Sequence, residues 1–117
     1  MQNKRIIGAK YEQMAGRYLE TLGYRVLEYN VHSRYGELDI VAMDGAYLVF
    51  VEVKYRGSLT CGHPLEAVDR KKQRTICHCA TFYMQKNGLE NLPVRFDVVS
   101  IVGDVVEVVA NAFEFIR

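Results

Sequence analysis

Two strand-like segments separated by Asp44-Gly45 constrain the fold of this 117-residue chain more than any other feature. Aspartate followed by glycine favours a tight two-residue turn, because such turns need backbone angles that glycine adopts without strain. The flanking segments, 37–43 and 46–55, are rich in apolar and β-branched residues. Together they predict a β-hairpin at the centre of the protein.

The remaining elements follow from hydrophobic spacing. Apolar residues recur at helical intervals over 7–22, and Gly23 is a plausible stop. A second helix is expected from near Pro64 to Asn87-Gly88, with a break near Asp69. Three further strand-like segments complete the pattern, at 24–29, 94–102 and 105–109. The sequence therefore predicts one α/β domain over 1–117, a mixed β-sheet flanked by helices in the order α-β-β-β-α-β-β.

Composition narrows the class of protein. Half of the residues are hydrophobic and a quarter are charged, which is ordinary for a soluble domain, and no apolar run is long enough to cross a membrane. The first residues lack the apolar core of a signal peptide, so a cytoplasmic protein is expected. An odd number of cysteines, three, argues against a disulfide framework. With a net charge of only +1, any nucleic-acid partner must meet a local basic patch.

The predicted hairpin gathers charged side chains. Counting outward from a turn at 44–45 puts Asp39 opposite Phe50 and Glu37 opposite Glu52. Because side chains alternate between the faces of a strand, one face is expected to carry four charged residues: Glu37, Asp39, Glu52 and Lys54. Asp39 would then be a diagonal neighbour of Glu52, roughly 7–8 Å away at the backbone.

Such a face is costly unless something neutralises it. Three acids on an otherwise apolar hairpin repel one another and resist loss of water, and a cation would relieve both penalties. Carboxylate oxygens suit Mg²⁺ or Mn²⁺ rather than zinc. Lys54 could orient or deprotonate an attacking water, or stabilise developing charge on a phosphate. Glu12, at the rim of the first helix's apolar stripe, could complete the acidic shell; a helix-rim glutamate exposed to solvent is the simpler alternative.

The ordered set resembles a known nuclease core. Asp39 followed by Glu52-x-Lys54 on the next strand, after a helix with Glu12, is similar to the PD-(D/E)XK nucleases and to the acidic set of archaeal Holliday-junction resolvases, although Leu38 stands where the motif has proline. More closely, the chain resembles the YraN family of uncharacterised bacterial nuclease-like proteins over residues 8–101. The matching stretches are Gly36-Glu37-Leu38-Asp39-Ile40-Val41, Phe50-Val51-Glu52-Val53-Lys54-Tyr55-Arg56, Lys72-Gln73-Arg74 and Arg95-Phe96-Asp97-Val98-Val99.

This resemblance implies a restriction-endonuclease-like fold and a metal-dependent endonuclease. In such an enzyme, Asp39, Glu52 and Glu12 would bind Mg²⁺ or Mn²⁺ and Lys54 would assist the water. The resemblance also favours DNA over RNA, and branched or structured DNA over plain duplex. If junctions are the substrate, a two-fold homodimer would supply two sites for two cuts.

Four basic residues are candidates for contact with nucleic acid. Arg34 and Arg56 flank the two ends of the acidic hairpin, and exposed loop charges are an equal alternative for each. Lys72 and Arg74 belong to a basic side of the second helix. Lys72 falls within the apolar stripe, so either its stem passes along the core or its amine points into the site; we favour the site.

Two other functions compete with catalysis. A non-catalytic nucleic-acid-binding module could retain the nuclease fold, although clustered acids facing phosphates would not help it bind. An adaptor could pair an exposed edge strand with a protein partner. Stabilisation by metal would distinguish the nuclease from the adaptor.

Overall fold

The computed structural model describes residues 4–56 and 68–116, and it confirms the predicted element order. Two helices and five strands follow one another as α-β-β-β-α-β-β. In chain order they are α1 (Lys4–Thr21), β1 (Arg25–Ser33), β2 (Gly36–Asp44), β3 (Tyr47–Arg56), α2 (Arg70–Asn87), β4 (Val94–Val102) and β5 (Val105–Phe113). No helix in the described ranges is long and apolar enough to span a membrane.

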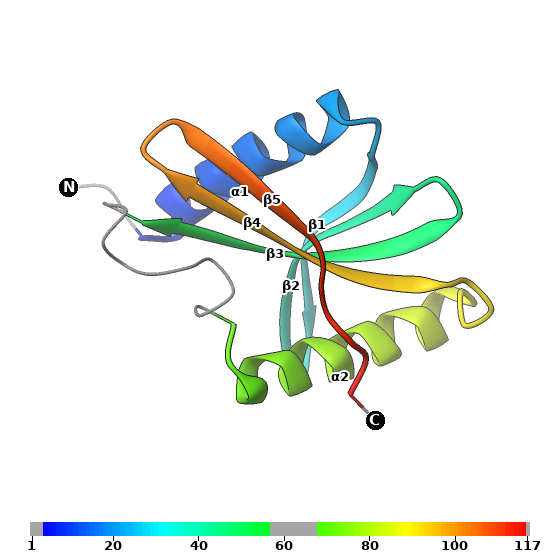
Figure 1. The fold of residues 1–117 in the computed structure, drawn as a ribbon. Coiled ribbons are helices and arrows are strands. Elements are labelled where there is room, and N and C mark those ends of the chain that lie inside the picture. Colours follow the sequence, from blue (N-terminus) through cyan, green and yellow to red (C-terminus); the bar gives the residue numbers. More distant parts are fainter. Residues whose placement is uncertain (1–3, 57–67, 117) are drawn as a thin grey trace.

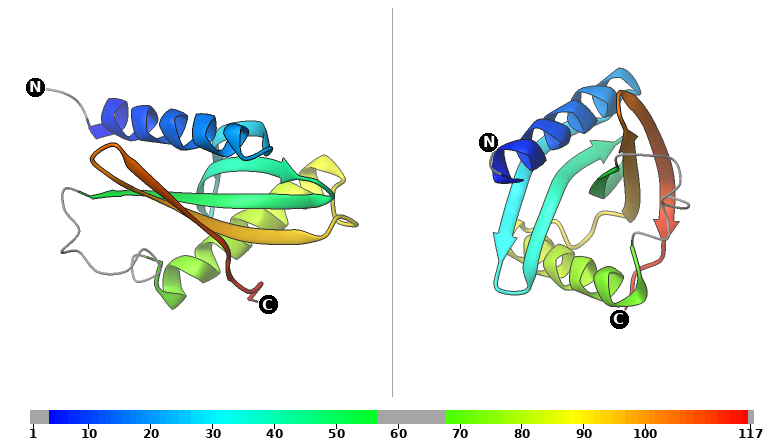
Figure 2. Two further views of the ribbon diagram at one scale, coloured as in Figure 1. Left: turned by 45° about the horizontal axis from the view of Figure 1, so that its top comes forward. Right: turned by 90° about the vertical axis from the view of Figure 1, so that its left-hand side faces the viewer.

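The five strands form one mixed sheet in which spatial order follows chain order. Neighbouring strands are antiparallel except β3 and β4, which run parallel. A parallel pair needs a long crossover connection, and α2 lies in the segment that joins these two strands. Figure 1 and the side views of Figure 2 show α1 and α2 on opposite faces of the sheet.

Each helix closes a separate hydrophobic core against its face. On the α1 face, Leu19 packs with Ile40 and Val49, all fully buried. On the α2 face, Ile76 and Tyr83 pack with Phe50, whose ring meets Tyr83 edge to face at 5.9 Å. Because β2 and β3 are covered on both sides, a polar side chain at their centre is held away from bulk water.

Helix α2 begins and ends where polar signals predict. Asp69 is its N-cap, and its side chain accepts a hydrogen bond of 2.8 Å from the backbone N–H of Lys72. Gly88 ends it in the left-handed conformation, with φ of 66°. The predicted end is confirmed, and the predicted break near Asp69 coincides with the start of α2; the predicted start near Pro64 lies outside the described residues.

The predicted turn of the β2–β3 hairpin is wrong by one position. Asp44 pairs with Tyr47, so Gly45 and Ala46 form the two-residue turn. Gly45 has φ of 60° and comes first in the turn, the place where a type II′ turn requires glycine. Asp44 stays in the strand, where its carboxylate binds the guanidinium of Arg95 at 2.8 Å. This contact between distant segments favours the observed register.

Arg95 is also the centre of a buried polar network. Its guanidinium donates to both carboxylate oxygens of Asp97 at 2.9 Å, and Asp97 is fully buried. The hydroxyl of Tyr24 donates to the same carboxylate at 2.6 Å and accepts from Arg95 at 2.7 Å. The backbone N–H of Asn111 makes a further bond to Asp97 at 2.9 Å. This satisfied network ties Tyr24, the residue just before β1, to β4 and β5.

Candidate active site

The candidate site lies where strands β2 and β3 separate. Backbone pairing between them runs from Asp44 and Tyr47 to Ile40 and Val51. Beyond that point the carboxylate of Asp39, not a backbone carbonyl, accepts the N–H of Val53 at 2.8 Å. The Asp39 side chain is therefore held between two strands by the fold itself. It also stands next to Glu52 in the corrected register, closer than the predicted diagonal position.

On the α1 side of this fork, two glutamates converge on Asp39. Glu12 of α1 and Glu37 of β2 each offer a carboxylate oxygen, and these oxygens and one from Asp39 all lie within 4.8 Å of one another. Gly8 and Ala9, one turn before Glu12, line the same hollow of about 320 Å³. Small residues there leave room for a ligand beside the carboxylates.

On the α2 side, Glu52 enters from β3. Its side chain is only 7% exposed, and Lys72 of α2 places Nζ 3.6 Å from its Oε2. Lys54, two residues further along β3, shares its face by alternation and is half-buried. The Lys72 amine thus points toward the acids, the orientation that the sequence favoured.

The four hairpin charges do not share one face as predicted. Glu37 gathers with Glu12 on the α1 side, whereas Glu52 contacts α2. Strict alternation is interrupted at Asp39, since Leu38 packs in the α2 core and Ile40, only two residues on, packs in the α1 core. On neighbouring β1, Asn30 adopts a left-handed backbone with φ of 53° beside this point. The acids consequently surround the fork from both faces.

Burial and mutual repulsion change the acidity of two of these groups. The pKa of Glu52 is raised to about 8, first because burial disfavours its charge and then through the adjacent Asp39 carboxyl; Lys72 and Lys54 partly oppose the shift. The pKa of Glu12 is raised to about 7, again by burial first and then by the Asp39 charge. A hydrogen bond from Asn30 lowers the Glu12 pKa somewhat. Without a cation, the site therefore disfavours the charged forms of Glu12 and Glu52.

The donor set fits a hard divalent cation. All the acids offer oxygen, the donor that Mg²⁺ and Mn²⁺ prefer. Octahedral Mg²⁺ has ligands at about 2.1 Å, so neighbouring and opposite oxygens lie about 3–4 Å apart. The oxygens of Glu12, Glu37 and Asp39 lie within 4.8 Å of one another, close to that range. Asp39 lies beside Glu12 and Glu37 on one side of the fork and beside Glu52 on the other, so a cation bound on either side could share its carboxylate.

The predicted arginines lie outside this acidic group. Arg34 is in the β1–β2 turn, where its guanidinium donates to the Tyr35 hydroxyl at 2.9 Å. Arg74 is an exposed residue of α2, two positions after Lys72 and so about 200° around the helix. Arg56 is half-buried at the end of β3. Contact of any of these residues with nucleic acid remains a prediction.

Two residues near the acids were not singled out from the sequence. The Asn30 side chain makes a hydrogen bond with the Glu12 carboxyl. The Nε2 atom of His32 lies 3.9 Å from a Glu37 oxygen. Both line the hollow beside Glu12. The sequence gives little indication of their role, because they reach the site only through the pairing of β1 with β2. Asparagine does tolerate the left-handed conformation better than most residues, which is one clue to a special position.

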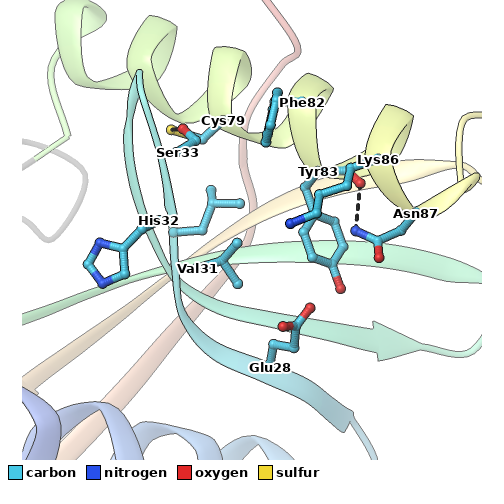
Figure 3. A pocket seen from close by; sticks show the side chains of 10 residues that line it. Glu28, Val31, His32, Ser33, Cys79, Phe82, Tyr83, Lys86 and Asn87 are labelled. Carbon is cyan, nitrogen blue, oxygen red and sulfur yellow. Dashed lines mark hydrogen bonds between the residues drawn. The ribbon is translucent and has the colours of Figure 1, made fainter.

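A second, smaller hollow lies between β1 and α2 (Figure 3). Its volume is about 80 Å³, room for a few waters. The Tyr83 hydroxyl faces Glu28 across it, and this contact together with burial raises the pKa of Tyr83, burial being the larger cause. The Asn87 amide donates to the Tyr83 carbonyl at 2.9 Å, which secures the last turn of α2. The contact between Tyr83 and Glu28 joins the helix to β1.

Comparison with known proteins agrees with the sequence resemblance. Residues 11–101 match the uncharacterised protein family UPF0102. A UPF0102 protein of Persephonella marina is 44% identical over 109 residues, 93% of this chain and 94% of the relative. A UPF0102 protein of Lachnoclostridium phytofermentans is 44% identical over 113 residues, 96% of each chain. One of Aliivibrio salmonicida is 50% identical over 101 residues, 85% of this chain and 82% of the relative.

Proposed function

We propose that this chain, which belongs to the uncharacterised protein family UPF0102, is a metal-dependent nuclease that hydrolyses phosphodiester bonds in DNA. The observation that carries the proposal is the meeting of acids from three elements at one fork in the sheet. Glu12 comes from α1, Asp39 from β2 and Glu52 from β3, and two lysines stand beside them. A fold maintains such mutual repulsion at a cost, so a cationic ligand is the simplest reason for it.

Mg²⁺ or Mn²⁺ is the cofactor we propose, held by Asp39, Glu52 and Glu12. A bound divalent ion would polarise a phosphoryl oxygen and make a water more acidic. The same acids would position that ion, since the Val53 N–H fixes one oxygen of Asp39 and leaves the other available. Burial between two helices keeps competing water away from Glu52.

The two lysines have distinct roles in this proposal. Lys54 is on the strand that carries Glu52, so its position is fixed by the sheet; we assign it the orientation of the attacking water and stabilisation of the phosphate charge. Lys72 comes from α2 and already pairs with Glu52. When a cation takes its place beside Glu52, the Lys72 amine becomes available to a phosphate oxygen.

Cleavage of a labelled panel tests the proposal. The panel contains single-stranded, duplex, flap and four-way-junction DNA and RNA, each with Mg²⁺, Mn²⁺ or EDTA. We expect metal-dependent cutting of DNA that Glu52→Ala and Lys54→Ala both abolish. Lys86→Ala, which removes an exposed lysine at the far end of α2, is the matched control and keeps wild-type activity.

The panel also distinguishes the alternative function. A protein that binds these molecules with salt-sensitive affinity but cuts none of them, with either metal, would be a non-catalytic nucleic-acid-binding module. Preferential cutting of junctions would support branched DNA as the substrate, and paired cuts would support the two-fold homodimer that such a substrate requires.

A further inference from the structure

A second surface, outside the acidic fork, combines flat rings with positive charge. The β1–β2 turn lies against α2 (Figure 2). A groove of about 920 Å³ is lined by residues of that turn, of α2 and of the C-terminal segment. Aromatic rings line much of the groove: Tyr35, His78, Phe82 and Phe115. Tyr35 and Phe82 are 42% and 40% exposed, a large apolar area for a surface that contacts only water.

Three side chains of the groove, Arg34, Tyr35 and His78, are stacked in a row, which we call the ladder. The Arg34 guanidinium lies 5.0 Å from the centre of the Tyr35 ring, and the Tyr35 ring stacks on His78 at 5.3 Å with only 22° between the planes. The turn is fixed against the helix, because Gly36 approaches Thr75 and Cys79 so closely that a side chain there would be in contact with both. The ladder is therefore held rigidly, with little conformational entropy left to lose on binding.

The helix extends this ladder along the groove. His78 and Phe82 are exposed and one turn apart on α2, so their rings are neighbours on the same stripe. Arg74 is exposed one turn before His78 on that stripe. Among the described lining residues, Arg34 is the one arginine, and Glu90, from the segment after α2, is the one acid. Arg74 lies just outside the lining, on the same helix stripe as His78.

A stacked pair of rings with an arginine beside it suits a ligand that is both flat and anionic. Unpaired nucleotides have these two properties, since their bases stack on aromatic side chains and their phosphates pair with arginine. A duplex cannot use the rings, because its bases already stack on one another. An apolar peptide would use the rings but would leave both arginines without a counter-charge.

We propose that this groove binds the unpaired bases of a DNA strand, so that the substrate of the acidic fork is DNA with a single-stranded segment. This inference rests on the proposed nuclease function for its link to cleavage. Tyr35 is four residues before Asp39 along the chain, about 13 Å in an extended strand. A strand that stacks on the ladder can therefore continue into the fork within a few nucleotides.

Binding measured without metal tests the groove separately from catalysis. Fluorescence anisotropy in EDTA compares a labelled 15-nucleotide oligothymidine with a labelled 15-base-pair duplex. Wild type is expected to bind the single strand more tightly, and Tyr35→Leu to weaken that binding about tenfold, within the range for loss of one base–aromatic stack. Phe82→Leu is a second test on the helix, independent of the turn, and is expected to weaken single-strand binding in the same direction.

Tyr47→Leu is the matched control. Tyr47 is 45% exposed and has an arginine 5.6 Å from its ring centre, but it is the first residue of β3 and does not line the groove. Single-strand affinity should remain within twofold of wild type. If wild type binds both probes equally and neither Tyr35→Leu nor Phe82→Leu changes single-strand affinity, the groove has another ligand and the inference is wrong.

The two proposals fail in different ways. Ring-dependent binding of the single strand, with no metal-dependent cutting of any substrate, would refute the nuclease and leave the groove as a binding site. Metal-dependent cutting of plain duplex as fast as that of flaps, with no effect of Tyr35→Leu, would support the nuclease and refute the groove.

Discussion

Replacing Glu52 with glutamine should stabilise the metal-free protein, and increasingly so as the pH rises. Glutamine keeps the shape of the side chain but cannot ionise. Burial and Asp39 raise the Glu52 pKa from 4.5 to about 8, so the folded protein holds that proton more tightly than the unfolded chain. A group of this kind contributes full stability below pH 4.5, and its contribution falls as the pH rises toward 8.

The size of the effect follows from the two pKa values. Each pKa unit corresponds to about 1.4 kcal/mol, so the interval from 4.5 to about 8 gives a ceiling of about 5 kcal/mol at pH 9. That pKa already includes the opposing effect of Lys72, whose side chain is 38% exposed and whose ion pair with Glu52 contributes about 1 kcal/mol or less. We expect Glu52→Gln to raise the free energy of unfolding by about 2–4 kcal/mol at pH 9, below that ceiling, and by less than about 1 kcal/mol at pH 5.

Urea unfolding followed by far-ultraviolet circular dichroism, in EDTA and reductant, measures this difference at pH 5, 7 and 9. Comparing variant and wild type at the same pH cancels the titration of groups that they share. Glu107→Gln, at an exposed glutamate of β5, is the control and should change the free energy of unfolding by less than about 0.5 kcal/mol throughout. Equal destabilisation by Glu52→Gln at all three pH values would show that Glu52 is ionised throughout and stabilised by Lys72, and would refute a raised Glu52 pKa.

Three further substitutions test other parts of the structure. Lys72→Gln removes the positive charge 3.6 Å from Glu52, so Mn²⁺ affinity measured by calorimetry should rise about fivefold; an unchanged affinity would show that Lys72 does not compete with the cation. Tyr24→Phe removes a hydroxyl bonded to buried Asp97, and the free energy of unfolding in urea should fall by about 2 kcal/mol; a loss within experimental error would mean that Arg95 alone satisfies that carboxylate. Gly88→Ala forces a side chain onto a backbone with φ of 66°, so unfolding in urea should show a loss of about 1 kcal/mol, and a gain in stability would contradict the assigned helix end.

The elements of the fold were predictable because local signals agree with tertiary structure. Asp69 and Gly88 limit α2, and alternation along β3 places Glu52 and Lys54 on one face, where Phe50 already points toward α2. Helical phase likewise directed Lys72 toward the acids. In each case one element carries all the information that the prediction needs.

The geometry at the fork was not predictable in the same way. The position of the β2–β3 turn depends on Asp44 binding Arg95, a residue 51 positions away in the chain. The break in alternation at Asp39 involves a side-chain bond to the next strand, and Asn30 adopts its left-handed conformation on a third strand. Local pattern cannot reveal these contacts, because they form only when the sheet is assembled. They are also the contacts that bring Glu12 and Glu37 to Asp39.

Calorimetric titration with Mn²⁺ measures whether the acids at the fork bind a divalent cation, and it requires no knowledge of the nucleic-acid substrate. Asp39→Asn is the decisive comparison: asparagine keeps an oxygen for the Val53 N–H while removing the charge shared by both sides of the fork. We expect saturable binding to wild type and at least tenfold weaker binding to the variant. Absence of saturable binding at millimolar Mn²⁺, or equal binding to both proteins, would contradict the claim that these acids form a metal site.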